Sequence, residues 1–132
     1  MKGRKNGSLE IMTAQSRLAN DIRIHRRKTG LSQHDLGQVL GYLTEGPVAR
    51  HEDGRRLPSL RIAIGYEIIF RVPVSEIFTD IRNEVSVTVE ARLAQLEQQL
   101  GQHSARDRDA TAIARKLTWL YERNNAALEP GL

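Results

Sequence analysis

The chain has 132 residues, of which 39% are hydrophobic and 27% charged, values typical of a soluble protein with one compact domain and an appendage. It contains no cysteine, which excludes disulfide bonds and thiolate metal sites and fits a reducing cytoplasm. No apolar run is long enough to span a membrane, and Lys2, Arg4 and Lys5 are followed by polar residues, unlike in a signal peptide. We therefore expect a cytoplasmic protein that has no contact with a membrane.

The positive charge lies in the first half of the chain. Residues 1–61 contain 12 Lys and Arg against 6 Asp and Glu, whereas residues 62–132 contain 8 against 10. A local basic excess favours binding to phosphate. Modest basicity is also common in proteins that bind no nucleic acid, so the charge acquires meaning only beside a motif.

Residues 1–12 are predicted to be a flexible basic arm, because the first eight are basic and polar and show no hydrophobic periodicity. A solvated tail is favoured over an arm that reaches into a DNA groove.

The first helix is predicted to run from residue 13 or 16 to residue 28. Leu18, Ile22 and His25 share its inward face by their spacing. We expect His25 to be a partly buried, hydrogen-bonded ring that packs on the second helix, in preference to a metal or catalytic role.

A second helix is predicted over residues 33–40. Ser32 precedes it as a favourable N-cap, and Gly41 follows as a C-cap that enters the left-handed conformation without strain. The spacing of Leu36, Val39 and Leu40 predicts that all three lie on one buried face.

A third helix is predicted over residues 45–52, with Thr44 as its cap and Pro47 in its first turn. Val48 lies on its buried side and Arg50 on the other. Two short helices joined by a tight turn and followed by a basic loop predict a helix-turn-helix, whose second helix enters the major groove of DNA.

Ser59 is predicted to cap a fourth helix over residues 60–70, which is apolar nearly all round and therefore central to the core. Gly65 within it implies a close neighbour. A short fifth helix begins at Pro73, and the apolar residues up to Phe78 close the core. The fold class is all-α.

The remainder of the chain is predicted to be a helical extension. Alternation over residues 85–89 favours a strand by propensity alone, but the apolar spacing that follows favours a helix over residues 83–100. Residues 103–107 are expected to form a polar loop before a second apolar seam, which Trp119 and Tyr121 flank. The two seams, a possible dimerisation element, consist of Val89, Leu93, Leu96, Leu100, Ile113, Leu117 and Leu120.

A set of residues in the first half carries a family resemblance: Ile22, Arg23, Arg26, Gly30, Leu31, Ser32, Gln33, Leu36, Leu40, Gly41, Val48, Arg50, Glu52, Gly54, Pro58, Ser59 and Leu60, followed by residues 72–78. Together they resemble the Xre/Cro family of helix-turn-helix DNA-binding proteins over roughly residues 18–78. The resemblance implies a five-helix, phage-repressor-like domain over residues 13–80, with residues 81–132 as an extension.

The chain departs from the family pattern in three places. The turn at residues 42–44 is one residue longer than usual, which leaves two registers open for the third helix. Gly37 stands where alanine is common, and Arg71 stands where a glycine often ends the fourth helix.

The resemblance also implies roles for single residues. Arg26 is expected to pair with an acid, with Glu52 as its partner, and Gln33 to donate to a DNA phosphate at the helix N-terminus, an anion site in its own right. From their positions, Arg50 can read guanine or hold a phosphate, and Arg55 and Arg56 can clasp phosphate. The full set of expected DNA contacts is Gln33, His34, Thr44, Glu45, Gly46, Ala49, Arg50, Arg55 and Arg56.

The function favoured by the sequence is that of a transcriptional regulator, most simply a repressor, which binds double-stranded DNA as a homodimer. The alternative is an antitoxin whose C-terminal helices hold a partner toxin. An enzyme is disfavoured, because the four histidines have no metal-ligand spacing and no nucleophile motif or phosphate loop is present. We expect no cofactor and no metal.

Overall fold

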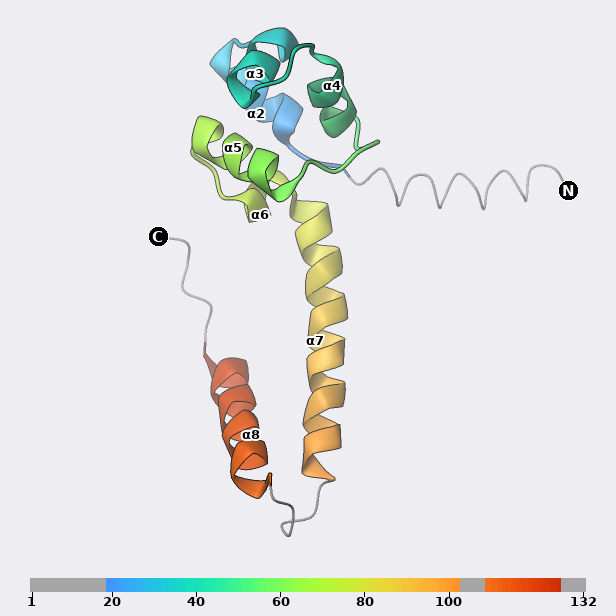
Figure 1. Cartoon of the computed structure of the whole chain (residues 1–132), viewed down its shortest axis with the longest axis vertical. Coiled ribbons are helices and arrows are strands. Elements are labelled where there is room, and N and C mark those ends of the chain that lie inside the picture. Colours follow the sequence, from blue (N-terminus) through green and yellow to red (C-terminus); the bar gives the residue numbers. More distant parts are fainter. Residues whose placement is uncertain (1–18, 103–108, 127–132) are drawn as a thin grey trace, which may run out of the picture. The chain divides into compact units, whose positions relative to one another are not determined.

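The computed structural model describes residues 19–102 and 109–126 (Figure 1). All regular secondary structure in these ranges is helical: α2 (Ile22–Thr29), α3 (Gln33–Leu40), α4 (Gly46–Glu52), α5 (Leu60–Phe70), α6 (Val74–Ile77), α7 (Thr79–Gly101) and α8 (Ala110–Asn125). The predicted all-α class is confirmed for this part of the chain. None of the helices in the described ranges is long and apolar enough to cross a membrane.

The chain divides into two compact units, Met1–Glu84 and Val85–Leu132. The boundary lies inside α7, close to the predicted domain boundary at residue 80. The predicted arm over residues 1–12 and the predicted loop over residues 103–107 lie outside the described residues.

The first unit has one hydrophobic core to which each of its short helices contributes. The buried residues are Ile22, Leu36, Val48, Ala63, Tyr66, Ile77 and Phe78, drawn from α2 to α6 and the residue after α6. Each fully buried aliphatic or aromatic side chain contributes about 1.5–3 kcal/mol relative to an exposed one. The core therefore fixes how α3 and α4 are held against the other helices, which Figure 1 shows gathered together.

The predicted limits of α3 are confirmed by its caps. The Ser32 hydroxyl accepts from the Asp35 N–H at 3.0 Å, and the Asp35 carboxylate accepts from the Ser32 N–H at 3.0 Å, which completes a capping box. Gly41 ends the helix with φ 93°. In the same way, Ser59 accepts from the Ile62 N–H and caps α5.

The predicted start of the first helix is wrong where it can be compared. Ala19 and Asn20 are not helical, and α2 begins at Ile22. The Asn20 side chain explains the late start, because its oxygen accepts from the Ile22 N–H at 3.0 Å and its nitrogen donates to the His51 carbonyl at 2.8 Å. Asparagine often competes with helical bonds in this way.

His25 is partly buried, as predicted. Its ring stacks on Phe70 of α5, with 5.6 Å between ring centroids, a contact that was not predicted. The helical spacing placed the ring on the inner face without indicating which helix lies opposite.

The turn between α3 and α4 explains Gly37. A Cβ at this position would lie 3.0 Å from the Thr44 carbonyl oxygen, so the turn passes over a point on α3 where a side chain is missing. The turn therefore passes close to α3 at a point where the absence of a side chain leaves room for its backbone.

The start of α4 differs by one residue from the prediction. The helix begins at Gly46, with Glu45 at the N-cap position and without a side-chain cap. The Thr44 hydroxyl accepts from the Gly46 N–H at 3.3 Å, so Thr44 still satisfies a donor at this end.

Two further positions in α5 agree with the sequence pattern. Gly65 has the predicted close neighbour, since a Cβ there would lie 2.7 Å from a methyl carbon of Leu40. Arg71 ends α5 in the left-handed conformation, with φ 57°, where glycine would be unstrained.

The predicted helix over residues 83–100 is confirmed and is longer, and it runs from the first unit into the second. It begins at Thr79, directly after α6, since the Arg82 N–H already bonds to the Phe78 carbonyl. Arg123 of α8 pairs with Glu90 of α7 and so ties the two helices together. Of the predicted seam residues, Leu100 and Leu120 are buried, whereas Val89 and Leu96 are exposed.

Candidate nucleic-acid interface

The residues expected to contact DNA lie on three consecutive segments of the first unit. Gln33 and His34 form the first turn of α3, residues 44–50 span the turn and most of α4, and Arg55 and Arg56 follow Gly54. Backbone bonds connect the last two segments, because the N–H groups of Arg55 and Arg56 both donate to the Arg50 carbonyl, at 3.1 and 3.3 Å. The basic loop therefore folds back directly onto the end of α4.

A buried carboxylate at the end of α4 joins this helix to α2 and α3. The Glu52 side chain is 0% exposed and accepts from Arg26 through both oxygens, at 2.6 and 3.2 Å. It also accepts from Arg23 at 3.1 Å and from Gln33 at 3.1 Å. The Arg26–Glu52 pair expected from the resemblance is present, and it is the centre of a larger network that joins α2, α3 and α4.

The network keeps Glu52 ionised despite its burial. Burial raises the pKa of the Glu52 carboxyl, but the hydrogen bonds from Arg26, Gln33 and Arg23 outweigh it and hold the pKa below its usual value. The four bonds satisfy the carboxylate, as a buried charge requires.

Asp53 extends the same network to the surface. One of its oxygens accepts from Arg23 at 2.9 Å and the other from Arg55 at 2.9 Å. Arg55 is therefore positioned by a carboxylate, although its side chain stays half-exposed and can still meet a phosphate.

Gln33 is oriented by its bond to Glu52. Its amide nitrogen donates one hydrogen to Glu52 and keeps a second hydrogen for another acceptor. Contact of Gln33 with a DNA phosphate stays a prediction, and the bond to Glu52 means that a buried group fixes the direction of the amide.

His34 and Glu45 are brought together across the gap between α3 and α4. The imidazole Nδ1 lies 3.8 Å from a Glu45 carboxylate oxygen, with both side chains more than half exposed. The carboxylate of Glu45 would repel a phosphate, so its useful contact with DNA would be with a base amino group.

The side chain of Arg50 extends along α4 towards the N-terminal end of this helix. A Cβ at Gly46 would come within 3.2 Å of the Arg50 guanidinium and 3.4 Å of the Thr44 hydroxyl. The missing side chain at Gly46 therefore provides space for Arg50, which is exposed. Ala49 and Gly46 beside it leave room for close approach of another molecule.

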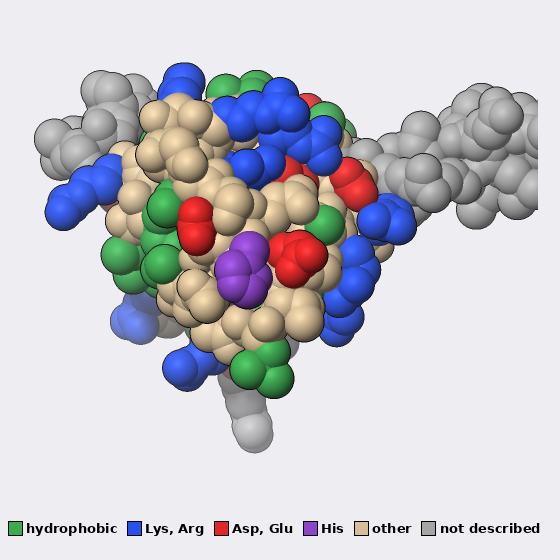
Figure 2. Space-filling view, turned by 90° about the horizontal axis from the view of Figure 1, so that it is seen from above, with side chains coloured by type: hydrophobic (Ala, Val, Ile, Leu, Met, Phe, Trp, Pro, Cys, Tyr) green, Lys and Arg blue, Asp and Glu red, His purple; other side chains and the backbone are tan. Residues whose placement is uncertain are grey.

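One face of the first unit is mixed in charge. Figure 2 shows Lys and Arg side chains mainly around the margin of the view, with acidic and histidine side chains between them.

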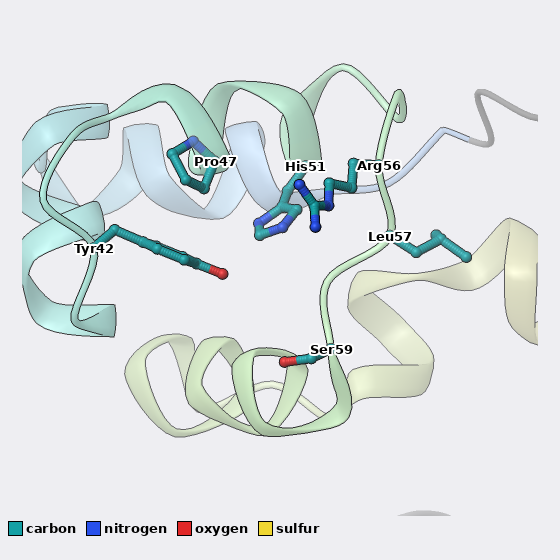
Figure 3. A pocket seen from close by; sticks show the side chains of 6 residues that line it. All are labelled: Tyr42, Pro47, His51, Arg56, Leu57 and Ser59. Atoms are coloured by element: carbon teal, nitrogen blue, oxygen red, sulfur yellow. The ribbon is translucent and has the colours of Figure 1, made fainter.

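Arg56 has a different environment from Arg55. It lines a pocket of about 300 Å³ together with Tyr42, Pro47, His51, Leu57 and Ser59. In Figure 3 its guanidinium points towards the His51 ring. The expectation that Arg56 contacts a phosphate stays a prediction, and the structure places its side chain beside this pocket.

His51 is a buried polar residue that the sequence reasoning did not single out. It is 3% exposed, and its Nδ1 lies 2.7 Å from the Tyr66 hydroxyl. Burial, followed by the charges of Arg56 and Arg50, lowers the pKa of His51 to about 4, so the ring is neutral at pH 7. The signal was available, because His51 lies three residues after the core residue Val48 on the same helix.

Arg23 and Asp53 were also missed as members of the network. Arginine and aspartate are common residue types near a protein surface, so neither could be recognised as part of a network without knowledge of its partner.

Among residues 19–102 and 109–126, no three His, Cys, Asp or Glu side chains are grouped as metal ligands. Comparisons with protein-family models, curated proteins and solved structures find no significant match.

Proposed function

We propose that the protein binds double-stranded DNA sequence-specifically and regulates transcription, with α4 in the major groove and the α3 N-terminus and the loop after Gly54 on the phosphate backbone. In this proposal α2 to α6 form a helix-turn-helix domain of the Xre/Cro kind. The observation that carries the proposal is the Glu52 network, which joins α4, the helix of the exposed Arg50, to α2 and α3. The adjacent Asp53 accepts from Arg55 and so connects the basic loop to the same end of α4.

The arrangement suits DNA for a physical reason. Base reading requires a side chain that is held in a defined place, because a bidentate contact fails when its donor is displaced. Arg50 lies on a helix whose end is anchored by a buried, fully bonded carboxylate. Gly46 and Ala49 add little bulk around it. Most of the affinity would come from phosphate contacts and would fall steeply with salt.

A single helix of this length reads few base pairs, so we propose that the protein acts as a homodimer on a pseudo-palindromic site, with half-sites about one helical turn apart. Whether it represses or activates depends on where the site lies relative to a promoter. Repression is the simpler case, because occupancy alone suffices.

The test is selection from a random duplex library at physiological salt with wild type, Arg50→Ala and Arg82→Ala in parallel. Arg82 is an exposed arginine near the start of α7, outside the three segments, and serves as the control. We expect wild type and Arg82→Ala to enrich the same two-fold-symmetric site, and Arg50→Ala to relax one position of it, with a loss of about 1–3 kcal/mol.

Two results would count against the proposal in different ways. If wild type enriches no site and its binding disappears at modest salt, sequence-specific regulation fails. If Arg50→Ala weakens binding to all sequences equally, Arg50 holds a phosphate, and another residue of α4 reads the bases.

A second function, that of an antitoxin, is favoured by one observation. In α8, Trp119 is 52% exposed and Tyr121 is 70% exposed. Exposed aromatic side chains are enriched where proteins meet other proteins. A stable complex with a partner that protects Trp119 from solvent, measured by its fluorescence, would support this function, whereas unchanged Trp119 fluorescence in the complex would exclude α8 as the contact.

A further inference from the structure

The pocket beside α4 contains a cation that lacks a carboxylate partner. Arg23, Arg26, Arg55 and Arg123 each pair with Asp or Glu. Arg56 has no such partner among the described residues; its side chain is exposed and lines the pocket. An unpaired guanidinium in a concave site favours an anion as its partner.

The groups around Arg56 complement an oxyanion. Tyr42 and Ser59 direct their hydroxyl groups into the same space in Figure 3. The Ser59 oxygen accepts from the Ile62 N–H, so its own proton remains available to a ligand. The Tyr42 hydroxyl has no hydrogen-bond partner within the described part of the chain.

His51 can provide a further donor. Its Nδ1 is held by the Tyr66 hydroxyl, so Nε2 is the nitrogen that remains for the pocket. When Tyr66 donates to Nδ1, the neutral ring carries its proton on Nε2 and can donate it to an anion. The ionisable groups that contact the ring or act on its charge are Tyr66 from α5, Tyr42 from the turn, Arg56 from the loop and Arg50 from α4. The nearby Glu52 carboxylate acts on Tyr66.

The pocket also has an apolar wall. Pro47 and the ring of Tyr42 form this wall. The Leu57 side chain points away from the other labelled residues in Figure 3. Its volume of about 300 Å³ lies at the lower end of the range of small-molecule sites. The space suits one ring or a short branched chain together with an anionic group.

We propose that this pocket binds a small organic oxyanion, a carboxylate or phosphate monoester with an apolar body, through Arg56, Tyr42, Ser59 and His51. This ligand site shares Arg56 with the loop proposed above to contact DNA, but ligand binding does not depend on DNA binding. The ligand would replace the missing counter-ion of Arg56 and would raise the pKa of His51, because a negative charge beside the ring favours its protonated form.

The experiment is a titration of the ¹⁵N-labelled full chain, followed by amide chemical shifts, at constant ionic strength. The probes are benzoate and phenyl phosphate, with benzamide as the neutral counterpart of the first and inorganic phosphate as the small counterpart of the second. We expect saturable shifts at Tyr42, His51 and Ser59 with benzoate or phenyl phosphate, at least about tenfold weaker binding of benzamide, and weaker binding of inorganic phosphate. Comparison of benzoate with phenyl phosphate identifies whether the pocket prefers a carboxylate or a phosphate group.

Two variants separate this pocket from general surface charge. Arg56→Gln should weaken binding about tenfold or more, whereas Arg55→Gln, in the same loop but paired with Asp53, should leave it unchanged. The His51 ring pKa, measured by NMR, should rise when the probe is bound to wild type.

Several results would overturn the proposal. These are equal effects of the Arg55 and Arg56 variants, benzamide binding as well as benzoate, or inorganic phosphate binding as well as phenyl phosphate. If a DNA duplex shifts Tyr42 and Ser59 while no small probe does, the pocket receives a backbone phosphate and the small-ligand proposal fails.

Discussion

Glu52→Gln is the substitution that tests most sharply how the first unit is held together. The change preserves the shape of the side chain but removes its charge and replaces one acceptor oxygen by an NH₂ group. In the structure both oxygens face donors, from Arg26 on one side and from Arg26, Arg23 and Gln33 on the other. Whichever way the new amide is turned, it brings a donor against the Arg26 guanidinium.

The expected loss of stability follows from burial. Breaking a buried ion pair costs about 3–5 kcal/mol, because the remaining charge has no partner. Arg26 loses the most, because its side chain is only 13% exposed and its charge would stay buried. The Arg23 side chain is 43% exposed and can be hydrated instead. Because one oxygen still accepts and Arg23 rehydrates, we expect a loss of about 2–3 kcal/mol, a large share of the 5–15 kcal/mol typical of a protein.

The assay is urea unfolding of the full chain, followed by far-ultraviolet circular dichroism, at several pH values. The matched control is Glu45→Gln, because Glu45 is exposed and faces only His34. We expect the control to stay within about 0.5 kcal/mol of wild type.

The pH dependence adds an independent criterion. The folded-state pKa of Glu52 lies below its unfolded value of about 4.3, so its charge contributes stability that is complete above that pH and is lost as the pH falls through the folded pKa. The difference between wild type and Glu52→Gln should therefore be constant from pH 7 to pH 5 and shrink in more acidic solution. A loss below about 0.5 kcal/mol at pH 7, or a difference that persists unchanged into acid, would refute the reasoning.

Three further predictions concern single positions. Arg71→Gly should stabilise the protein by about 0.5–1 kcal/mol in urea unfolding. It removes the strain of a left-handed non-glycine residue, about 1–2 kcal/mol, and this outweighs the extra conformational freedom that glycine gives the unfolded chain. A loss of stability would show that the contacts of the Arg71 side chain contribute more than its strain costs. Gly37→Val should destabilise by about 1–3 kcal/mol, because its Cβ meets the Thr44 carbonyl at 3.0 Å, whereas the exposed neighbour Gln38→Val should change little; equal effects would show that the turn can move away. The His51 ring should titrate near pH 4 in the folded protein, as measured by NMR. Because the ring of the unfolded chain takes up a proton below about pH 6.5, the free energy of unfolding should fall by up to about 1.4 kcal/mol per pH unit between pH 6.5 and pH 4. His51→Gln should remove this slope.

The helix ends could be predicted where a local side chain determines them. Ser32, Gly41 and Ser59 act within three or four residues of their own position, so their effect is visible in a short stretch of sequence. The start of α2 was missed for the opposite reason, since Asn20 is held by the carbonyl of His51, which is 31 residues away.

The candidate site was predictable in its chemistry but not in its connections. Positions on a helix indicated which side of α4 carries Arg50, and the family resemblance supplied the Arg26–Glu52 pair. No short-range pattern indicated that Arg55 pairs with Asp53 while its neighbour Arg56 faces a pocket, because the path of the loop after Gly54 decides this. The buried His51 followed from spacing alone and was overlooked.

The central claim is that the first turn of α3, α4 and the loop after Gly54 contact DNA. The most direct test maps the amide chemical-shift changes of the ¹⁵N-labelled full chain when duplex DNA is added, at low and at physiological salt. We expect the largest changes at the first turn of α3, along α4 and at residues 54–56, with loss of the weaker ones at higher salt. Changes confined to α5, α6 or α8, or no changes at low salt, would contradict the claim.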